Sequence, residues 1–183
     1  MSTIRDWLLH SPLPKLEARM LLQYVGDFSR AYLVAHDDEE LPEMMVWQLN
    51  DMQQARVDGV PMAYLLGERE FYGRVFQVTP AVLIPRPETE LLVETVMQYL
   101  PQGGRVWDVG TGSGIIAITT ALERSDAQVH ASDISAEALD IARNNTGRLG
   151  AQVAFHLGSW YAVEPQQNEL VDVLVSNPPY IHK

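Results

Sequence analysis

The chain has 183 residues, enough for one large domain or two small ones, and 46% of them are hydrophobic, which is sufficient to form a core. Its 24 acidic and 13 basic residues leave a formal net charge of −11, which opposes general binding to DNA or RNA. Cysteine is absent, so the sequence excludes disulfides, cysteine-ligated metal clusters and a thiol nucleophile.

Metal and membrane sites are also disfavoured. The five histidines are scattered and none has the close spacing of a metal-binding motif, so we expect no metal site. No stretch is apolar for long enough to span a membrane, and the start of the chain lacks the features of a secretory signal. We therefore expect a cytoplasmic protein that binds neither membranes nor DNA.

Residues 1–68 predict a small helical domain with almost no strand signal. Helix-start residues and apolar residues at helical spacing alternate with glycine stops. Thr3 with Asp6 marks the first start, and Gly26 is the expected end of the second helix. Further helices are expected over residues 14–25, 29–36 and 42–59, with a short turn after Pro61.

The pattern changes from Glu70. The stretch EFYGRVFQVT alternates apolar and polar residues around Gly73 and predicts a hairpin. The stretch VLIPRPETE follows and predicts a stiff joint before a helix over residues 88–100. The buried stripe of that helix is expected to contain Leu91, Leu92, Thr95, Val96 and Tyr99. We therefore expect a helical domain over 1–68, a hairpin and linker over 69–87 and a second domain over 88–183.

The second domain alternates strands and helices. Strands are expected over residues 105–109, 128–133, 153–157 and 171–175, and helices over 115–124 and 136–149, the latter closed by Gly150. Parallel strands need crossover connections of this length, so the alternation predicts an α/β domain with a mostly parallel sheet.

A glycine-rich loop, VWDVGTGSG, leaves the first of these strands. Gly110, Gly112 and Gly114 let a ligand approach the backbone at the start of a helix. The spacing does not match the dinucleotide fingerprint, but Asp133 ends the next strand, where a carboxylate can accept both hydroxyls of a ribose. The pair therefore indicates a nucleoside ligand, although the loop alone is also compatible with a tight turn and Asp133 with a helix cap.

The stretch SNPPYI follows the last predicted strand. The prolines restrict the backbone, so the side-chain oxygen of Asn177 and the carbonyl of Pro178 would point in fixed directions. Two such acceptors can hold both hydrogens of a planar NH2 group and orient its nitrogen towards an electrophile, while Tyr180 stacks on the planar group. This arrangement fits methyl transfer from a sulfonium donor. The alternative interpretation is that the motif forms only a turn that ends the strand.

Together, DVGTGSG, ASD, NPPY and IPRPETE make the chain similar to the release-factor glutamine N5-methyltransferases (the PrmC/HemK family) over essentially its whole length. NPPY alone is shared with adenine-N6 DNA methyltransferases, whereas the helical start, the hairpin and IPRPETE are more specific. The resemblance implies a helical bundle followed by a Rossmann-like class I methyltransferase domain. It also implies S-adenosylmethionine as donor, S-adenosyl-L-homocysteine as product, and the glutamine of the Gly-Gly-Gln loop of peptide-chain release factors as acceptor.

The same resemblance implies the roles of individual residues. Gly110, Thr111, Gly112, Ser113 and Gly114 would line the methionine and ribose of the donor, Asp133 would bind the ribose hydroxyls, and Trp160 would pack beside the adenine. Asn177, Pro178 and Tyr180 would be catalytic and, with Pro179, would hold the substrate amide, with Asn177 also next to the donor. The helical domain would help to dock the release factor, and we expect a monomer.

One departure from the family pattern lies in LGSWY. Ser159 stands where the family usually has an aspartate, so the resemblance does not carry over a contact to the adenine amino group at this position. Trp160 has a role in the core as its alternative. Two other functions compete with the first. They are an adenine-N6 nucleic-acid methyltransferase, disfavoured by the acidic charge, and a non-catalytic protein whose helical domain binds a partner.

The last expectation concerns the end of the chain. VDVLVS has the pattern of a strand buried on both faces and paired on both edges. A chain that ended at Lys183 would leave one edge bare, so we expect a truncated form or a part of a longer protein that lacks the C-terminal strands. Such a fragment would keep half of the donor site but lack activity, because the far wall of the pocket is missing.

Overall fold

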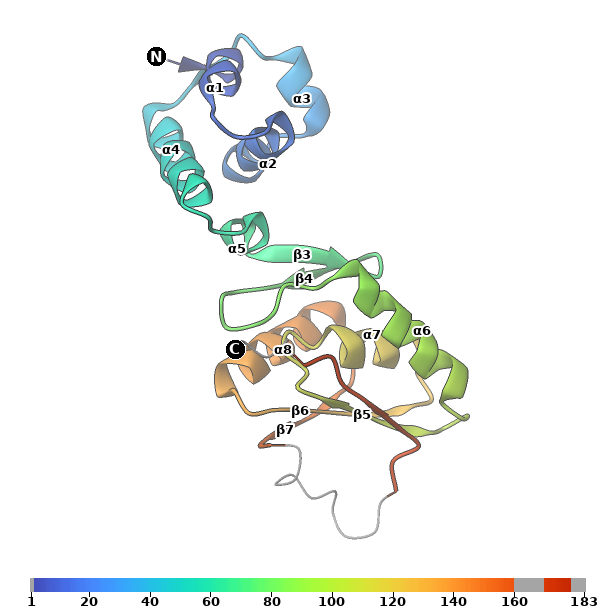
Figure 1. Cartoon of the computed structure of the whole chain (residues 1–183). Coiled ribbons are helices and arrows are strands. Elements are labelled where there is room, and N and C mark those ends of the chain that lie inside the picture. The colour runs from blue at the N-terminus through green and yellow to red at the C-terminus, as the bar shows by residue number, and fades with distance from the viewer. Residues whose placement is uncertain (1, 160–169, 179–183) are drawn as a thin grey trace. The chain divides into compact units, whose positions relative to one another are not determined.

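The computed structural model describes residues 2–159 and 170–178 and contains two compact units, Met1–Leu66 and Gly67–Lys183 (Figure 1). The first unit consists mainly of helices, and the second combines a hairpin with a parallel sheet and its helices. Along the described part of the chain, no helix is long and apolar enough to cross a membrane.

The first unit confirms the predicted helices. Thr3 and Asp6 form a reciprocal capping box at the start of the first helix. One prediction was wrong, because Gly26 is still helical and Asp27, in the left-handed conformation, ends the second helix. The helices are α1 (Ile4–His10), α2 (Lys15–Gly26), α3 (Arg30–Ala35), α4 (Glu43–Val57) and α5 (Met62–Leu66).

These helices surround an apolar core that includes the fully buried Leu21, Leu22 and Leu49. Two buried or half-buried polar contacts fix α4 against its neighbours. The indole of Trp7 donates to Asn50 Oδ1 at 3.0 Å, and Arg56 forms an ion pair with Glu17 of α2 at 2.9 Å.

A short antiparallel pairing in this unit was not predicted. β1 (Ser2–Thr3) pairs with β2 (Glu40–Leu41), and Leu41 is buried in the helical core. Two residues are too few for an alternating pattern, so such a pairing leaves no periodic signal in the sequence.

The predicted hairpin is present as β3 (Glu68–Phe71) and β4 (Arg74–Gln77). Tyr72 and Gly73 connect the strands, and both have positive φ angles, 51° and 70°, as a two-residue turn of the primed type requires. Phe71 and Phe76 are buried in the core of the second unit. By its contacts, the hairpin is part of the second compact unit.

The joint after the hairpin leads into a 3₁₀ turn, η1 (Pro87–Thr89), and then into α6 (Glu90–Tyr99). The predicted buried stripe of this helix was partly wrong. Val93 and Val96 are buried, whereas Leu91 and Tyr99 are 65% and 69% exposed. Glu90 has a structural role, because its carboxylate accepts a hydrogen bond from the backbone N–H of Tyr72 in the hairpin turn.

The sheet of the second unit is parallel, as predicted. Its strands lie in the order β7-β6-β5-β8, so the order reverses beside β5, at the kind of switch point where open sheets bind ligands. The elements are β5 (Arg105–Val109), α7 (Ile115–Glu123), β6 (Gln128–Asp133), α8 (Ala136–Leu149), β7 (Ala154–Leu157) and β8 (Val173–Val175).

The helices α6, α7 and α8 lie on one face of this sheet (Figure 1). Val106, Val129 and Val175 are buried in the core on that face. Among the described residues β8 pairs with β5 alone, so its other edge is bare, as the sequence predicted for the chain as given. Leu174 is 66% exposed, so the burial on both faces that the apolar pattern indicates is not present here.

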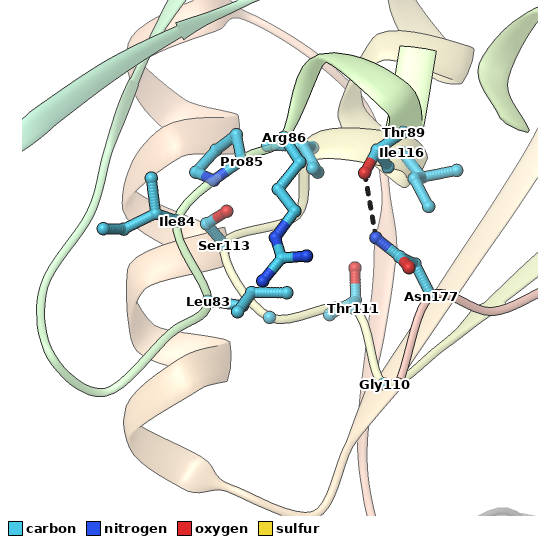
Figure 2. A pocket seen from close by; sticks show the side chains of 12 residues that line it. Leu83, Ile84, Pro85, Arg86, Thr89, Gly110, Thr111, Ser113, Ile116 and Asn177 are labelled. Carbon is cyan, nitrogen blue, oxygen red and sulfur yellow. Dashed lines mark hydrogen bonds between the residues drawn. The ribbon is translucent and has the colours of Figure 1, made fainter. Parts of the chain in front are cut away.

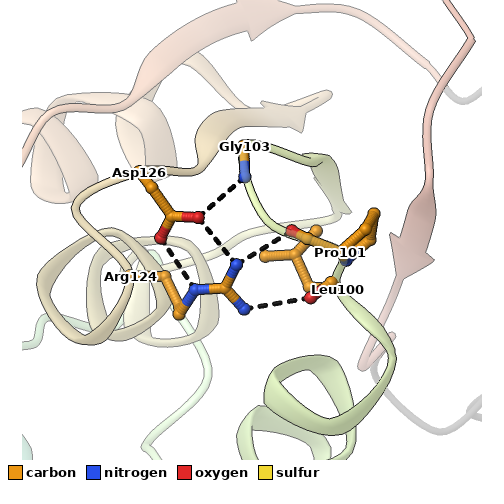
Figure 3. A network of polar contacts seen from close by, with 5 residues as sticks. All are labelled: Leu100, Pro101, Gly103, Arg124 and Asp126. Carbon is orange, nitrogen blue, oxygen red and sulfur yellow. Dashed lines mark hydrogen bonds and ion pairs between the residues drawn. The ribbon is translucent and has the colours of Figure 1, made fainter.

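Arg124 joins the two connections that lead into the amino-terminal ends of β5 and β6 (Figure 3). Its guanidinium donates to the carbonyls of Leu100 and Pro101 at 3.0 and 2.8 Å and forms an ion pair with Asp126. Asp126 also accepts from the N–H of Gly103, and the hydrogen bond from Arg124 is the main reason that the pKa of this carboxyl lies well below its usual range. The connections after α6 and α7 are thereby held together.

Asn145 of α8 connects three segments of the second unit. It is fully buried, accepts from the N–H of Gln77 at 2.7 Å and donates to the carbonyl of Gln77 at 3.0 Å. It also donates to the carbonyl of Ser113 in the glycine loop at 2.9 Å. One side chain thus satisfies backbone groups at the end of the hairpin and in the loop.

We expect Asn145→Ala to lower the free energy of unfolding by about 2–4 kcal/mol, because three backbone groups lose their partner. The neighbouring Asn144 is exposed, so Asn144→Ala is the matched control and should change stability by less than about 0.5 kcal/mol. Urea unfolding followed by circular dichroism measures both values. Equal effects of the two variants would contradict this role of Asn145.

Candidate functional site

The candidate site is a small cavity at the carboxyl end of the sheet, beside the switch point (Figure 2). Its volume is about 30 Å³, which accommodates a small group but not a whole nucleoside. Three segments line it: the joint before α6, the glycine loop with the start of α7, and Asn177, the second residue after β8. The lining residues are Leu83, Ile84, Pro85, Arg86, Thr89, Gly110, Thr111, Gly112, Ser113, Ile115, Ile116 and Asn177.

The three glycines of the loop have positive φ angles but different surroundings. A Cβ atom on Gly110 or Gly112 would meet nothing within 4 Å, so the space beside these residues is open to a ligand. A Cβ on Gly114 would lie 2.7 Å from Ile118 Cδ1 and 3.2 Å from Ala142 Cβ. The third glycine is therefore required for the packing of α7 against α8.

The loop is held by acceptors from the neighbouring strand β6. The N–H groups of Gly110 and Thr111 donate to the carbonyl of Ser132 at 2.8 and 3.0 Å. Asp133 accepts from the N–H of Gly112 at 2.9 Å with one carboxylate oxygen and from the N–H of Ser135 at 3.0 Å with the other. Hydrogen bonds within the protein therefore fix the shape of the loop.

These contacts show that Asp133 is not the N-cap of α8. Ser135 is the N-cap of α8, and its hydroxyl accepts from Ala138 N. Asp133 instead connects the end of β6 to the glycine loop. Each carboxylate oxygen keeps a second lone pair, so these bonds leave room for ribose hydroxyls.

Asp108 lies beneath the loop and is 1% exposed. Its Oδ2 accepts from the hydroxyl of Thr111 at 2.7 Å and from the N–H of Ala117 at 3.3 Å, while no described group donates to its buried Oδ1. Burial raises the pKa of Asp108 to about 6, with a smaller contribution from Asp133, and the two hydrogen bonds offset part of the shift. An unsatisfied acceptor next to a loop with open glycines fits a ligand that carries donors or positive charge.

Asn177 is anchored by Thr89, 88 residues earlier in the chain. Its Nδ2 donates to Thr89 Oγ1 at 2.9 Å, and Thr89 is buried (Figure 2). No described residue donates to Asn177 Oδ1, and the residue lines the cavity beside Gly110 and Thr111. The amide is therefore oriented by its nitrogen, which leaves its oxygen available as an acceptor.

The structure brings the glycine loop, Asp133 and Asn177 to one end of the sheet, as the sequence predicted. Pro178 follows Asn177 and is exposed. The predicted roles of Trp160, Pro179 and Tyr180 lie outside the described residues, and Ser159 is exposed at the end of the described segment. Within the described ranges, no group of three or more histidine or acidic side chains is placed to hold a metal ion.

Sequence reasoning missed Thr89, Asp108 and Asn145 as parts of this site. Of these three residues, only Asn145 could have been identified from the sequence. It stands seven residues after Ala138 and three after Ala142, on the buried stripe of α8, where an unpaired amide would be costly. Thr89 falls within the expected helix over residues 88–100, and nothing near it in the sequence indicates a partner 88 residues away.

We expect Asp108→Asn to stabilise the fold more at pH 8 than at pH 5. Because the pKa of Asp108 is raised in the folded state, the folded state binds the proton more tightly than the unfolded state does. The wild type therefore loses stability as the pH rises through about 6. Asparagine does not titrate, so the variant does not show this loss. The stability difference between variant and wild type should therefore increase by about 1–1.5 kcal/mol from pH 5 to pH 8. Urea unfolding at both pH values tests this, and a difference independent of pH would contradict it.

Two family models match the chain in order. The PrmC N-terminal domain matches residues 5–67, and the Methyltransferase small domain matches residues 87–183. Among solved structures, the tRNA (uracil-54, C5)-methyltransferase of Pyrococcus abyssi in complex with S-adenosyl-L-homocysteine has a TM-score of 0.51 at 18% identity. It covers 61% of this chain and 27% of that one, and it confirms the class I methyltransferase fold.

Curated relatives match almost the whole chain. The release factor glutamine methyltransferase of Neisseria gonorrhoeae is 55% identical over 98% of this chain, and that of Bordetella pertussis is 49% identical over 99%. The chain spans about two thirds of their length, 66% and 67%. By these identities, and by both family models, the chain belongs to the release factor glutamine methyltransferase family.

Proposed function

We propose that this protein transfers a methyl group from S-adenosylmethionine to the side-chain amide nitrogen of the glutamine in the Gly-Gly-Gln loop of peptide-chain release factors. The names of the relatives support the substrate class. The observation that carries the chemistry is the free Oδ1 of Asn177, directed by the bond between Thr89 and Nδ2 and placed beside the glycine loop.

The donor supplies an electrophilic methyl group on a positively charged sulfur. We assign its methionine and ribose to Gly110–Gly114, where Gly110 and Gly112 leave open space, and its ribose hydroxyls to Asp133. Trp160 is proposed to pack beside the adenine. The buried, unsatisfied oxygen of Asp108 adds negative potential beneath this position when the carboxyl is ionised.

Asn177 and Pro178 are proposed to hold the acceptor. The glutamine amide has two N–H groups, which Asn177 Oδ1 and the carbonyl of Pro178 can accept, while Tyr180 stacks on its plane. The nitrogen then forms its bond to the methyl carbon as the carbon–sulfur bond breaks, and the electron pair of that bond returns to sulfur. The nitrogen loses one proton to water afterwards, so no strong base is needed before attack.

The reaction is tested by mass spectrometry of a release factor incubated with the protein and S-adenosylmethionine. We expect a mass gain of one methyl group on the Gly-Gly-Gln glutamine and none on a DNA duplex. Asn177→Ala should reduce turnover by about 100-fold or more, because it removes an acceptor aligned with the reacting nitrogen, and should leave donor affinity nearly unchanged. Methylation of DNA, or an equal loss of donor affinity, would contradict the assignment.

Thr89 is a positioning residue in this proposal. Thr89→Val keeps the shape of the side chain but removes the oxygen that holds Asn177 Nδ2, so the amide is free to turn. We expect kcat to fall by about 10-fold with little change in donor affinity, and Thr89→Ser to restore most of it. Equal activity of the Val and Ser variants in single-turnover assays would show that this hydrogen bond does not position Asn177.

A further inference from the structure

Arg86 lies in the joint between the hairpin and α6 and has no role in the methyl transfer proposed so far. It stands between Pro85 and Pro87 in the stretch IPRPETE. Pro85 is buried, and the proline that follows Arg86 restricts its backbone to the extended conformation observed, with φ −107° and ψ 143°. The base of this side chain is therefore fixed, although the residue as a whole is exposed.

The guanidinium of Arg86 points into the cavity at the carboxyl end of the sheet. Figure 2 shows the side chain extending from the joint toward the glycine loop. Arg86 lines the cavity together with Gly110, Thr111 and Asn177, and among the described residues that line it, Arg86 alone has a charged side chain. A ligand at this end of the sheet therefore meets one cation.

The contacts of the glycine loop indicate which part of the donor lies beside Arg86. Asp133, to which the ribose hydroxyls are assigned, ends β6 and bonds to Gly112. Asn177, to which the acceptor nitrogen is assigned, follows β8, which lies on the opposite side of β5 from β6. A donor that extends along the loop from Asp133 to Asn177 has its adenosine toward β6 and its sulfur and amino-acid part at the cavity.

The chemistry of that part of the donor matches Arg86. The α-carboxylate of the amino-acid part is the only negatively charged group of S-adenosylmethionine. A guanidinium presents a planar fork of N–H donors that fits the two oxygens of a carboxylate. The cavity volume of about 30 Å³ suits a group of this size rather than a nucleoside. The cation thus lies where the donor carries its single negative charge.

We propose that Arg86 binds the α-carboxylate of the donor and makes the site selective for a donor with an intact amino-acid end. This inference rests on the proposed function for the identity and direction of the donor. Arg86 and the glycine loop belong to the same compact unit, Gly67–Lys183. Loss of the guanidinium should therefore affect ligands that have the carboxylate and leave ligands without it unchanged.

The test compares two ligands of the whole chain by isothermal titration calorimetry. One is S-adenosyl-L-homocysteine, and the other is its decarboxylated analogue, which keeps the amino group but has hydrogen in place of the α-carboxylate. Arg86→Gln should weaken binding of S-adenosyl-L-homocysteine about 10-fold, because a charge-assisted contact is lost. It should change the affinity for the analogue by less than about 2-fold, because that ligand has no group for the guanidinium.

Two further variants control this comparison. Arg86→Lys should recover part of the lost affinity, because an ammonium keeps the charge but not the planar fork. Arg148→Gln removes an exposed arginine of α8 and should change neither affinity by more than about 2-fold. Circular dichroism checks that all variants are folded.

Wild-type affinity of Arg86→Gln for S-adenosyl-L-homocysteine would overturn the proposal, as would a wild type that binds neither ligand. Equal weakening of both ligands would also overturn it, because that is the result expected of a purely structural role. So would a loss confined to release-factor affinity, which would place Arg86 against the acceptor. The proposed function fails separately. If the wild type transfers no methyl group to the release factor while Arg86→Gln still weakens only the ligand with the carboxylate, the contact stands and the assigned reaction does not.

Discussion

The glycine loop has its shape because polar groups of two other segments, α8 and the end of β6, hold it. Asn145 is the most important of them, since it connects α8 to the end of the hairpin and to the carbonyl of Ser113. A loop with positive φ angles at every second residue has no repeating hydrogen-bond pattern of its own, so its backbone groups need partners from elsewhere. The carbonyl of Ser132 and the carboxylate of Asp133 provide the others.

This support makes the site preorganised. The N–H groups of Gly110, Thr111 and Gly112 are already bonded to the protein, so the loop does not have to reorganise around a ligand. The open space beside Gly110 and Gly112 provides contact, and recognition of N–H and O–H groups is left to acceptors such as Asn177 Oδ1. Acceptors suit groups with N–H or O–H bonds to donate, such as an amide and ribose hydroxyls.

The two units carry different surface chemistry. The helical unit has a groove formed by α1, α2 and α3 and lined by basic side chains such as Arg19 and exposed aliphatic ones such as Leu16, whereas the second unit has a small cavity between a glycine loop and Asn177. The groove thus lies within one compact unit and the cavity within the other. The two family models divide the chain in the same way.

The sequence alone was sufficient for the elements whose signals are local. The strands Arg105–Val109 and Gln128–Asp133 and the helix Ala136–Leu149 have their predicted bounds, because periodicity and caps act over a few residues. The glycine loop and Asn177 were likewise identified from short motifs. The exposed face of α6 was not, because a side chain is buried only if another element covers it.

Only the tertiary structure decided which distant groups become partners. Thr89 and Asn177 are 88 residues apart, and Gln77 and Asn145 are 68 apart. Nothing in the residues around either position specifies the other, because the contact exists only after the sheet has formed and α6 and α8 have packed on it. Short sequence motifs therefore identify the residue types of the site, whereas the direction of the Asn177 amide depends on the packing of the whole second unit.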